Sequence, residues 1–303
     1  MANIGVLCRT NYLTEKLSIV LALTSLCFIQ PTFNSTICYG GGHSWDGETY
    51  RKNKSIQFQG ALDQIRAYSF QGNENILDIG SGDGEITSIL VSRTKGTVLG
   101  LDIDSSMVDH ATSHYGNARL KFIKQNASQI DYKDRFHLIT SFNAAQWIED
   151  QSGFLHRLRL ALKFNGKILI GMPTVIADER IGTSLMVSIF KQITTSEKWK
   201  KYFKDFRSPW RFFSKSEYEG LLIQAGLKPI QIEITKKPFK LPSQDAFIGW
   251  MRQISPHLRY LPDDLKNEFL REVAGEYLKQ VPLSEQGEVF LSHAQLEVIA
   301  IKD

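Results

Sequence analysis

The feature that most constrains this chain is a regular alternation of short aliphatic segments with amphipathic ones from residue 75 onward. The short segments are too brief and too rich in Val, Ile and Leu for helices, which predicts strands at Ile76–Ile79, Val98–Asp102, Lys121–Lys124, His137–Ser141 and Lys167–Met172. Between them, apolar residues recur at intervals of three and four, which predicts helices at Gly84–Arg93, Ser105–Tyr115 and Gly153–Leu162. The expected class is α/β, with a doubly wound, mainly parallel sheet and helices on both faces.

The alternation stops after Met172, where longer helical stretches begin. Ile176–Phe206 is predicted to be helical, and so is Ser243–Gln280, with interruptions at Pro256 and Pro262. Two inserts at the same end of a sheet are expected to form one helical cap over a pocket. The remaining predicted elements are a helix capped by Ser214, at Ser214–Ala225, and two final strands, at Pro229–Thr235 and Gln295–Ile301.

Residues 1–42 are expected to stand apart from a single elaborated domain at 43–303. Leu17–Ile29 is nearly apolar, but it is shorter than the roughly 20 residues of a membrane-spanning helix. It is therefore either a membrane-targeting or anchoring leader or a dispensable extension. Within the domain, the predicted core comprises 73–175, 214–240 and 286–303, and the cap comprises 176–213 and 241–285.

The composition excludes several other classes of protein. A formal charge of +4 on 303 residues is too weak to indicate a nucleic-acid partner. The three cysteines, Cys8, Cys27 and Cys38, all precede the predicted domain, so no disulfide framework or thiol metal site is expected in it. We expect a cytoplasmic protein without a metal site, with membrane contact only through residues 17–29.

A glycine-rich turn follows the first predicted strand in ILDIGSGDGEIT, residues 76–87. Glycines remove Cβ atoms where a backbone must approach a ligand, and they permit positive φ. The dinucleotide fingerprint is G-x-G-x-x-G, whereas here Glu85 stands in the third glycine's place and the pattern is Asp78-x-Gly80-x-Gly82-x-Gly84. This spacing favours S-adenosylmethionine, which has no pyrophosphate to place at a helix N-terminus.

An acidic residue at the end of the second predicted strand supports the same interpretation. Asp102 follows Gly84 by 18 residues, where its carboxylate can accept hydrogen bonds from both hydroxyls of a ribose. The glycine turn alone is also compatible with a simple tight loop. The two features together, in this order on these elements, predict cofactor binding.

Four segments carry a resemblance to a known family: LDIGSGDGEIT, LGLDIDSSMVDHA, FHLITSFNAAQWIED and LKFNGKILI. They resemble the successive motifs of class I S-adenosylmethionine-dependent methyltransferases. Within that superfamily the chain is similar to the group of trans-aconitate, juvenile hormone acid and malonyl-carrier-protein methyltransferases. The resemblance covers about residues 45–303.

On the cofactor side, the resemblance implies a role for eight residues. Asp78, Gly80 and Gly82 would surround the methionine part, and Asp102 would hold the ribose. Ile103 and Met107 would flank the adenine, whose amino group would bond the residue at position 126. The family usually has an acid there, whereas this chain has Asn126, which can still accept through its carbonyl oxygen. Ser141 would lie in the loop that faces the transferred methyl.

On the acceptor side, the resemblance implies roles for Trp147, in the acceptor pocket, and Gln57, on the acceptor carboxylate. A core aromatic and a solvated helix residue are the alternatives for these two positions. Cap arginines at 180, 207, 211 and 259 are candidates to pair with an acidic acceptor or an acyl carrier protein, or they form a solvated face.

The chain shows no His-Asp or Cys-His constellation, which fits methyl transfer to a carboxylate, already ionised at neutral pH. The predicted activity is O-methylation of a small carboxylic acid or acyl thioester by in-line displacement, driven by alignment. The alternatives are methylation of another small molecule at N or C, an NAD-dependent oxidoreductase, and a non-catalytic S-adenosylmethionine-binding protein.

Overall fold

The computed structural model describes residues 55–176 and 181–303, without the side chains of 55–57. The predicted leader, including Leu17–Ile29, lies outside these residues. Among the helices of the described ranges, none combines the length and the apolar character needed to cross a bilayer.

The described strands form one seven-stranded sheet in the order β3-β2-β1-β4-β5-β7-β6. β1 to β5 pair in parallel, and β7 pairs antiparallel with both β5 and β6. This arrangement confirms the predicted fold class. The strands are β1 (Ile76–Ile79), β2 (Val98–Asp102), β3 (Leu120–Lys124), β4 (Phe136–Phe142), β5 (Leu162–Pro173), β6 (Lys228–Leu241) and β7 (Val289–Ile301).

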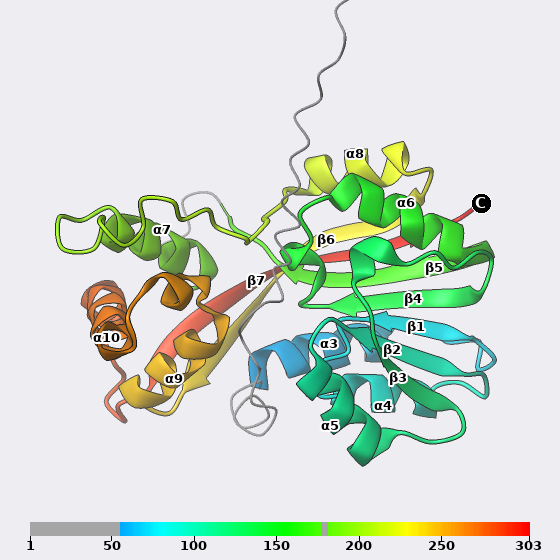
Figure 1. The fold of residues 1–303 in the computed structure, drawn as a ribbon, viewed down its shortest axis with the longest axis horizontal. Helices are drawn as coiled ribbons and strands as arrows, with labels where there is room; N and C mark the ends of the chain where they lie inside the picture. Colours follow the sequence, from blue (N-terminus) through cyan, green and yellow to red (C-terminus); the bar gives the residue numbers. More distant parts are fainter. Residues whose placement is uncertain (1–54, 177–180) are drawn as a thin grey trace, which may run out of the picture. The chain divides into compact units, whose positions relative to one another are not determined.

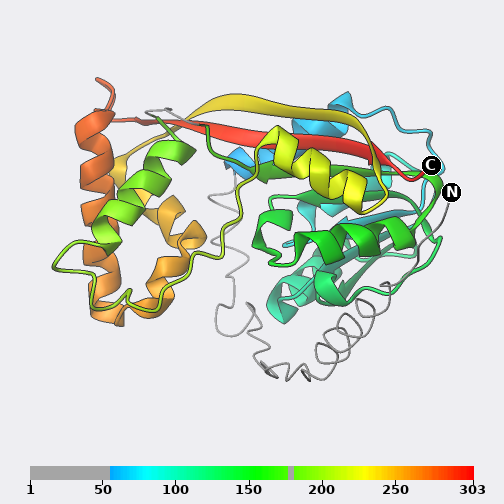
Figure 2. The same cartoon turned by 90° about the horizontal axis from the view of Figure 1, so that it is seen from above.

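Helices cover both faces of the sheet, as Figures 1 and 2 show. On one face lie α3 (Ser55–Ala67), α4 (Glu85–Ser92) and α5 (Ser105–Tyr115), and on the other lie α6 (Gln151–Ala161) and α8 (Lys215–Gln224). Because successive strand residues point to opposite faces, Ile76 packs in the first layer and Leu77 in the second. Short 3₁₀ turns, η1 (Ala127–Gln129) and η2 (Ala145–Trp147), follow β3 and β4.

β6 and β7 are longer than the sequence predicts. Both predicted strands lie inside observed ones, but β6 and β7 continue as a two-stranded ribbon from Lys236↔Ala294 to Leu241↔Val289, beyond the last pairing with β5. Lys236, Lys237 and Pro238 interrupt the apolar pattern there. An edge strand such as β6 tolerates a proline, because its outward N–H needs no ladder partner.

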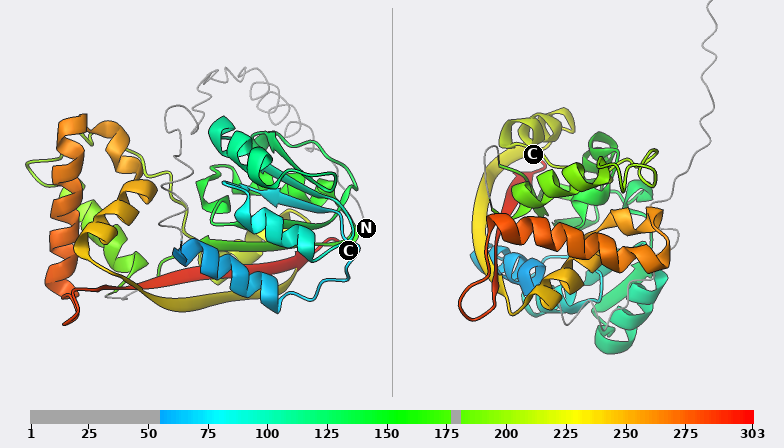
Figure 3. Two further views of the ribbon diagram at one scale, coloured as in Figure 1. Left: turned by 90° about the horizontal axis from the view of Figure 1, so that it is seen from below. Right: turned by 90° about the vertical axis from the view of Figure 1, so that its left-hand side faces the viewer.

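The helices of the two inserts share one hydrophobic cluster. Figure 3 shows these helices at the end of the β6–β7 ribbon. We call α7 (Thr183–Thr194), α9 (Gln244–Ile254), η3 (Pro256–Tyr260) and α10 (Asp263–Gln280) the helical subdomain. The core of this subdomain contains Phe190 of α7, Met251 of α9, Phe269 of α10 and also Leu291 of the adjoining β7. The inserts therefore bury their apolar faces against each other.

The continuous helix predicted over Ile176–Phe206 is wrong. The described helix, α7, ends at Thr194, and successive turns follow it. The hydroxyls of Thr194 and Thr195 donate to the Phe190 and Lys191 carbonyls at 2.8 and 2.9 Å, which competes with helix propagation. Trp199 and Phe203 in these turns are nevertheless buried in the subdomain core.

Candidate functional site

Three glycines shape the loop after β1. Gly80, Gly82 and Gly84 have φ of 73°, 53° and 84°, a region that favours glycine. A Cβ on Gly80 would meet the Ala144 side chain, and one on Gly84 would lie 2.7 Å from the Ala111 Cβ. A Cβ on Gly82 would meet nothing within 4 Å. Gly80 and Gly84 are thus required by packing, whereas Gly82 borders open space.

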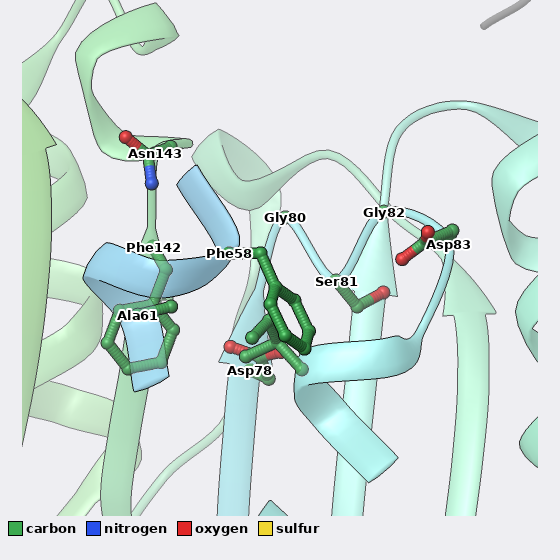
Figure 4. A pocket seen from close by; sticks show the side chains of 10 residues that line it. Phe58, Ala61, Asp78, Gly80, Ser81, Gly82, Asp83, Phe142 and Asn143 are labelled. Atoms are coloured by element: carbon green, nitrogen blue, oxygen red, sulfur yellow. The ribbon is translucent and has the colours of Figure 1, made fainter. Parts of the chain in front are cut away.

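A pocket opens beside this loop, at the carboxyl ends of β1 and β4. Figure 4 shows side chains from α3, the glycine loop and the end of β4 around it. Its lining consists of Phe58, Ala61, Asp78, Gly80, Ser81, Gly82, Asp83, Ile86, Phe142 and Asn143. Three of the predicted cofactor residues, Asp78, Gly80 and Gly82, therefore share one pocket.

Asp78 forms the floor of the pocket and is buried between two threonines. The Thr87 hydroxyl donates to its Oδ2 at 2.6 Å, and the Thr140 hydroxyl donates to its Oδ1 at 2.7 Å. Burial raises the pKa of Asp78 to about 6, although both hydroxyls act in the opposite direction, and the charge of Asp102 raises it further. The two hydrogen bonds hold the Asp78 carboxylate in one orientation, and its burial costs the solvation free energy of the charged form.

Asp102 connects the end of β2 to the glycine loop. Its Oδ2 accepts the Gly82 N–H at 2.9 Å, and its Oδ1 accepts the Asp104 N–H at 3.0 Å. Burial raises the pKa of Asp102, and these backbone hydrogen bonds oppose the rise. Ile103 beside it is 39% exposed, whereas Met107 on α5 is 3% exposed. The carboxylate is fixed, and an apolar side chain beside it faces solvent.

Asn126 already uses its side chain locally. It is the N-cap of η1, and its Oδ1 accepts the Ser128 N–H at 2.9 Å. A further donor therefore has to share that oxygen. It is not among the residues that line the pocket.

The predicted acceptor-side residues are dispersed. Ser141 is fully buried and pairs in register with Ile170, which packs in the α6 and α8 layer. Trp147 is half-buried in η2, and neither residue is among those lining the pocket. Gln57 lies in α3, but its side chain is outside the described structure.

Other residues reach the pocket that the motifs did not identify. Phe58 and Ala61 come from α3, and Phe142 comes from the last position of β4. Asn143 follows with φ of 56°, and its N–H donates to the Gly171 carbonyl at 2.7 Å. No predicted helix range covers this segment; the spacing of Phe58 and Ala61, three residues apart on α3, is the signal that could have identified them.

Of the arginines proposed for the acceptor, Arg180 lies outside the described residues. Arg211 forms an ion pair with Glu149 at 3.5 Å, and Arg207 and Arg259 are exposed. Across the described ranges, no group of three or more His, Cys, Asp or Glu side chains is placed to hold a metal ion.

A mainly parallel sheet whose pocket lies at the carboxyl ends of β1 and β4 is typical of α/β enzymes of the Rossmann-like class. A family model described as a methyltransferase domain matches residues 70–225, just over half of the chain. The chain belongs to this methyltransferase domain family, which confirms the predicted enzyme class.

Curated relatives and solved structures agree with this assignment. The chain is 25% identical over 213 residues to juvenile hormone acid O-methyltransferase of Drosophila melanogaster, covering 66% of this chain and 69% of that one. It is 22% identical over 262 residues to trans-aconitate 2-methyltransferase of Enterobacter sp. (strain 638), covering 86% and 98%. Phosphoethanolamine N-methyltransferase 2 of Haemonchus contortus, solved with S-adenosyl-L-methionine, shares the fold at a TM-score of 0.54 and 18% identity, covering 84% and 56%.

Proposed function

We propose that this methyltransferase takes its methyl group from S-adenosylmethionine and transfers it to the carboxylate of a small acid. The observation that carries the proposal is the composition of the pocket. Among the described residues that line it, the ionisable ones are Asp78 and Asp83, with no histidine, lysine, tyrosine or cysteine. Both oxygens of Asp78 already accept a threonine hydroxyl, which makes this carboxylate a poor base for an acceptor that must lose a proton. A carboxylate acceptor is already ionised at neutral pH and needs no base.

The residues present fit the cofactor. Gly82 offers a backbone with open space at its Cα, and the oriented Asp102 carboxylate retains lone pairs for ribose hydroxyls. Ile103, exposed beside Asp102, supplies an apolar surface for the adenine ring of the cofactor. Met107, buried on α5, supports this surface from below. We assign Asn126 to the adenine amino group through the lone pair that Ser128 leaves free.

The bound cofactor supplies an electrophilic methyl on a sulfonium. The chain's own contribution is alignment and exclusion of water. Phe58, Ala61 and Phe142 give the pocket apolar walls, which suit the carbon skeleton of an organic acid. Asp78, held by two hydroxyls, orients polar groups at the pocket floor. Trp147 and Gln57 remain our candidates for contact with the acceptor, and Ser141 supports the β4 end from the opposite face.

The names of the relatives support a carboxylate acceptor, since two of them are methyltransferases of juvenile hormone acid and trans-aconitate. A free small acid is our first choice. An acyl group on a carrier protein is the second choice, supported by the exposed side chains of Arg207 and Arg259.

The test incubates the purified protein with methyl-labelled S-adenosylmethionine and a panel of free acids, carrier-protein thioesters, amines and phenols. We expect label in a product that releases methanol on alkaline hydrolysis, because a methyl ester is base-labile and an N- or C-methyl group is not. Asp102→Ala should abolish the transfer, and Asp109→Ala, an exposed carboxylate on α5, is the matched control. Base-stable label, or label only on amines, refutes the carboxylate acceptor.

A further inference from the structure

Two glutamines are buried under α3 without hydrogen-bond partners. Gln64 of α3 is 4% exposed, and Gln295 of β7 is 0% exposed. Within the described ranges, neither Nε2 nor Oε1 of either side chain has a partner, and the same holds for Nε2 of the nearby His293. Buried amides without partners reduce stability, so a native protein that retains them usually has a use for them.

Two glycines make room for these amides. A Cβ on Gly171 of β5 would lie 2.7 Å from Nε2 of Gln295 and closer still to Nε2 of Gln64. A Cβ on Gly60 of α3 would lie 2.6 Å from Oε1 of Gln295. The two side chains thus converge in space that any larger residue at positions 60 and 171 would fill.

The amides lie directly beside the pocket. Ala61 lines the pocket, and Gln64 follows it by one turn of α3. Phe142 also lines the pocket, and it pairs in register with Gly171, so both positions face the same side of the sheet. The two glutamines are not among the lining residues; they lie directly behind this part of the pocket wall, on the side away from the glycine loop.

Near the amides, the lysine that the structure describes opposite His293 is already paired. Lys237, opposite His293 in the β6–β7 register, has its Nζ 3.0 Å from Asp63 Oδ2 and 3.5 Å from Glu297 Oε1. Burial, and then the charge of Lys237, lower the pKa of His293 to about 4, so this ring is neutral at pH 7. Among the groups that the structure describes here, an anion would find Lys237 already paired and His293 uncharged.

A pair of amides presents four N–H donors and two acceptor oxygens. A carboxylate only accepts and would leave both Oε1 atoms unpaired. A hydroxyl or an amide both donates and accepts, so it can pair with an Oε1 and an Nε2 at the same time. We infer that Gln64 and Gln295 are specificity residues for an uncharged hydrogen-bonding group, a hydroxyl or an amide, carried by the acceptor in addition to its carboxylate. This inference rests on the proposed carboxylate methylation.

The first arm of the test measures thermal stability. Gln64→Met and Gln295→Met keep the length of each side chain and remove its polar atoms, and Gln224→Met, exposed at the end of α8, is the matched control. We expect both buried variants to melt at a higher temperature than the wild type and the control to be unchanged. A lower melting temperature in both variants indicates that the amides only hold a structural water, and it overturns the inference.

The second arm measures methyl transfer to decanoic acid and to its monohydroxy derivatives, one hydroxyl position at a time. At one position we expect kcat/KM about tenfold above that for the plain acid, the size of one neutral hydrogen bond. Both Met variants should lose this preference and keep the rate on plain acid and the affinity for S-adenosylmethionine.

Equal rates with and without the hydroxyl at every position, or a preference that both variants retain, overturn the inference and leave the proposed function standing. If neither these acids nor any free acid or thioester of the panel above is methylated, the proposed function itself fails and the inference fails with it. The two failures are therefore distinguishable.

Discussion

Asp78→Asn should stabilise the protein, and the gain should depend on pH. In the folded state the pKa of Asp78 is about 6, against an ordinary value of 3.8. The folded state therefore holds this proton more tightly than the unfolded state, and ionisation of Asp78 lowers stability as pH rises from about 4 to 6. A pKa difference of about two units lowers the free energy of unfolding by about 3 kcal/mol above that pH window, at about 1.4 kcal/mol per unit. An asparagine carries no charge and still accepts from Thr87 or Thr140 through its oxygen.

The assay is thermal unfolding of wild type and Asp78→Asn at pH values from 4 to 7.5. We expect similar melting temperatures near pH 4 and a gain of roughly 6–12 °C for the variant above pH 6.5, from about 2–4 °C per kcal/mol for a domain of this size. Asp109→Asn, on the exposed face of α5, controls for the loss of a surface carboxylate. A variant that is less stable at pH 7, or whose gain does not change with pH, refutes the reasoning. Cofactor affinity should fall, because the carboxylate at the pocket floor is lost.

Three further predictions concern other positions. Asp102→Ala should weaken S-adenosylmethionine binding at least tenfold in calorimetry with the circular dichroism spectrum unchanged, and an unaltered affinity would falsify the ribose assignment. Trp147→Ala should spare cofactor affinity and lower turnover about tenfold; if neither changes, the side chain is only structural. His257, stacked 4.4 Å from Phe190, has its pKa lowered to about 3 by burial, so its contribution to stability disappears as pH falls below about 6.5. His257→Phe should reduce the loss of melting temperature between pH 6.5 and 4, and an equally steep loss would contradict the assignment.

The core of the fold was predictable because its signals are local. Short aliphatic strands alternate with amphipathic helices, and the glycine loop after Ile79 requires positive φ at residues 80, 82 and 84. These features depend on a few neighbouring residues. The strands, the sheet class and the pocket at Asp78 follow from them directly.

The acceptor side of the pocket was less predictable for two reasons. It depends on which residues of β4 face the pocket, and it depends on contacts between segments far apart in the sequence. Both faces of the sheet are covered, so the letters SFN do not reveal that Phe142 faces the pocket and Ser141 faces away from it. The convergence of Gln64 and Gln295 joins α3 to β7, far apart in the chain. No local pattern encodes such a contact.

The place of β7 between β5 and β6 also has a kinetic consequence. Pro173 of β5 pairs with Gln295 of β7, so the edge of β5 stays unpaired until a distant part of the chain arrives. Pairing over such a separation requires the closure of a long loop, which slows folding. Until it closes, an open parallel edge is available to other chains. We therefore expect the yield of folded enzyme to depend on whether β7 pairs with β5 before the exposed edge of β5 associates with another chain.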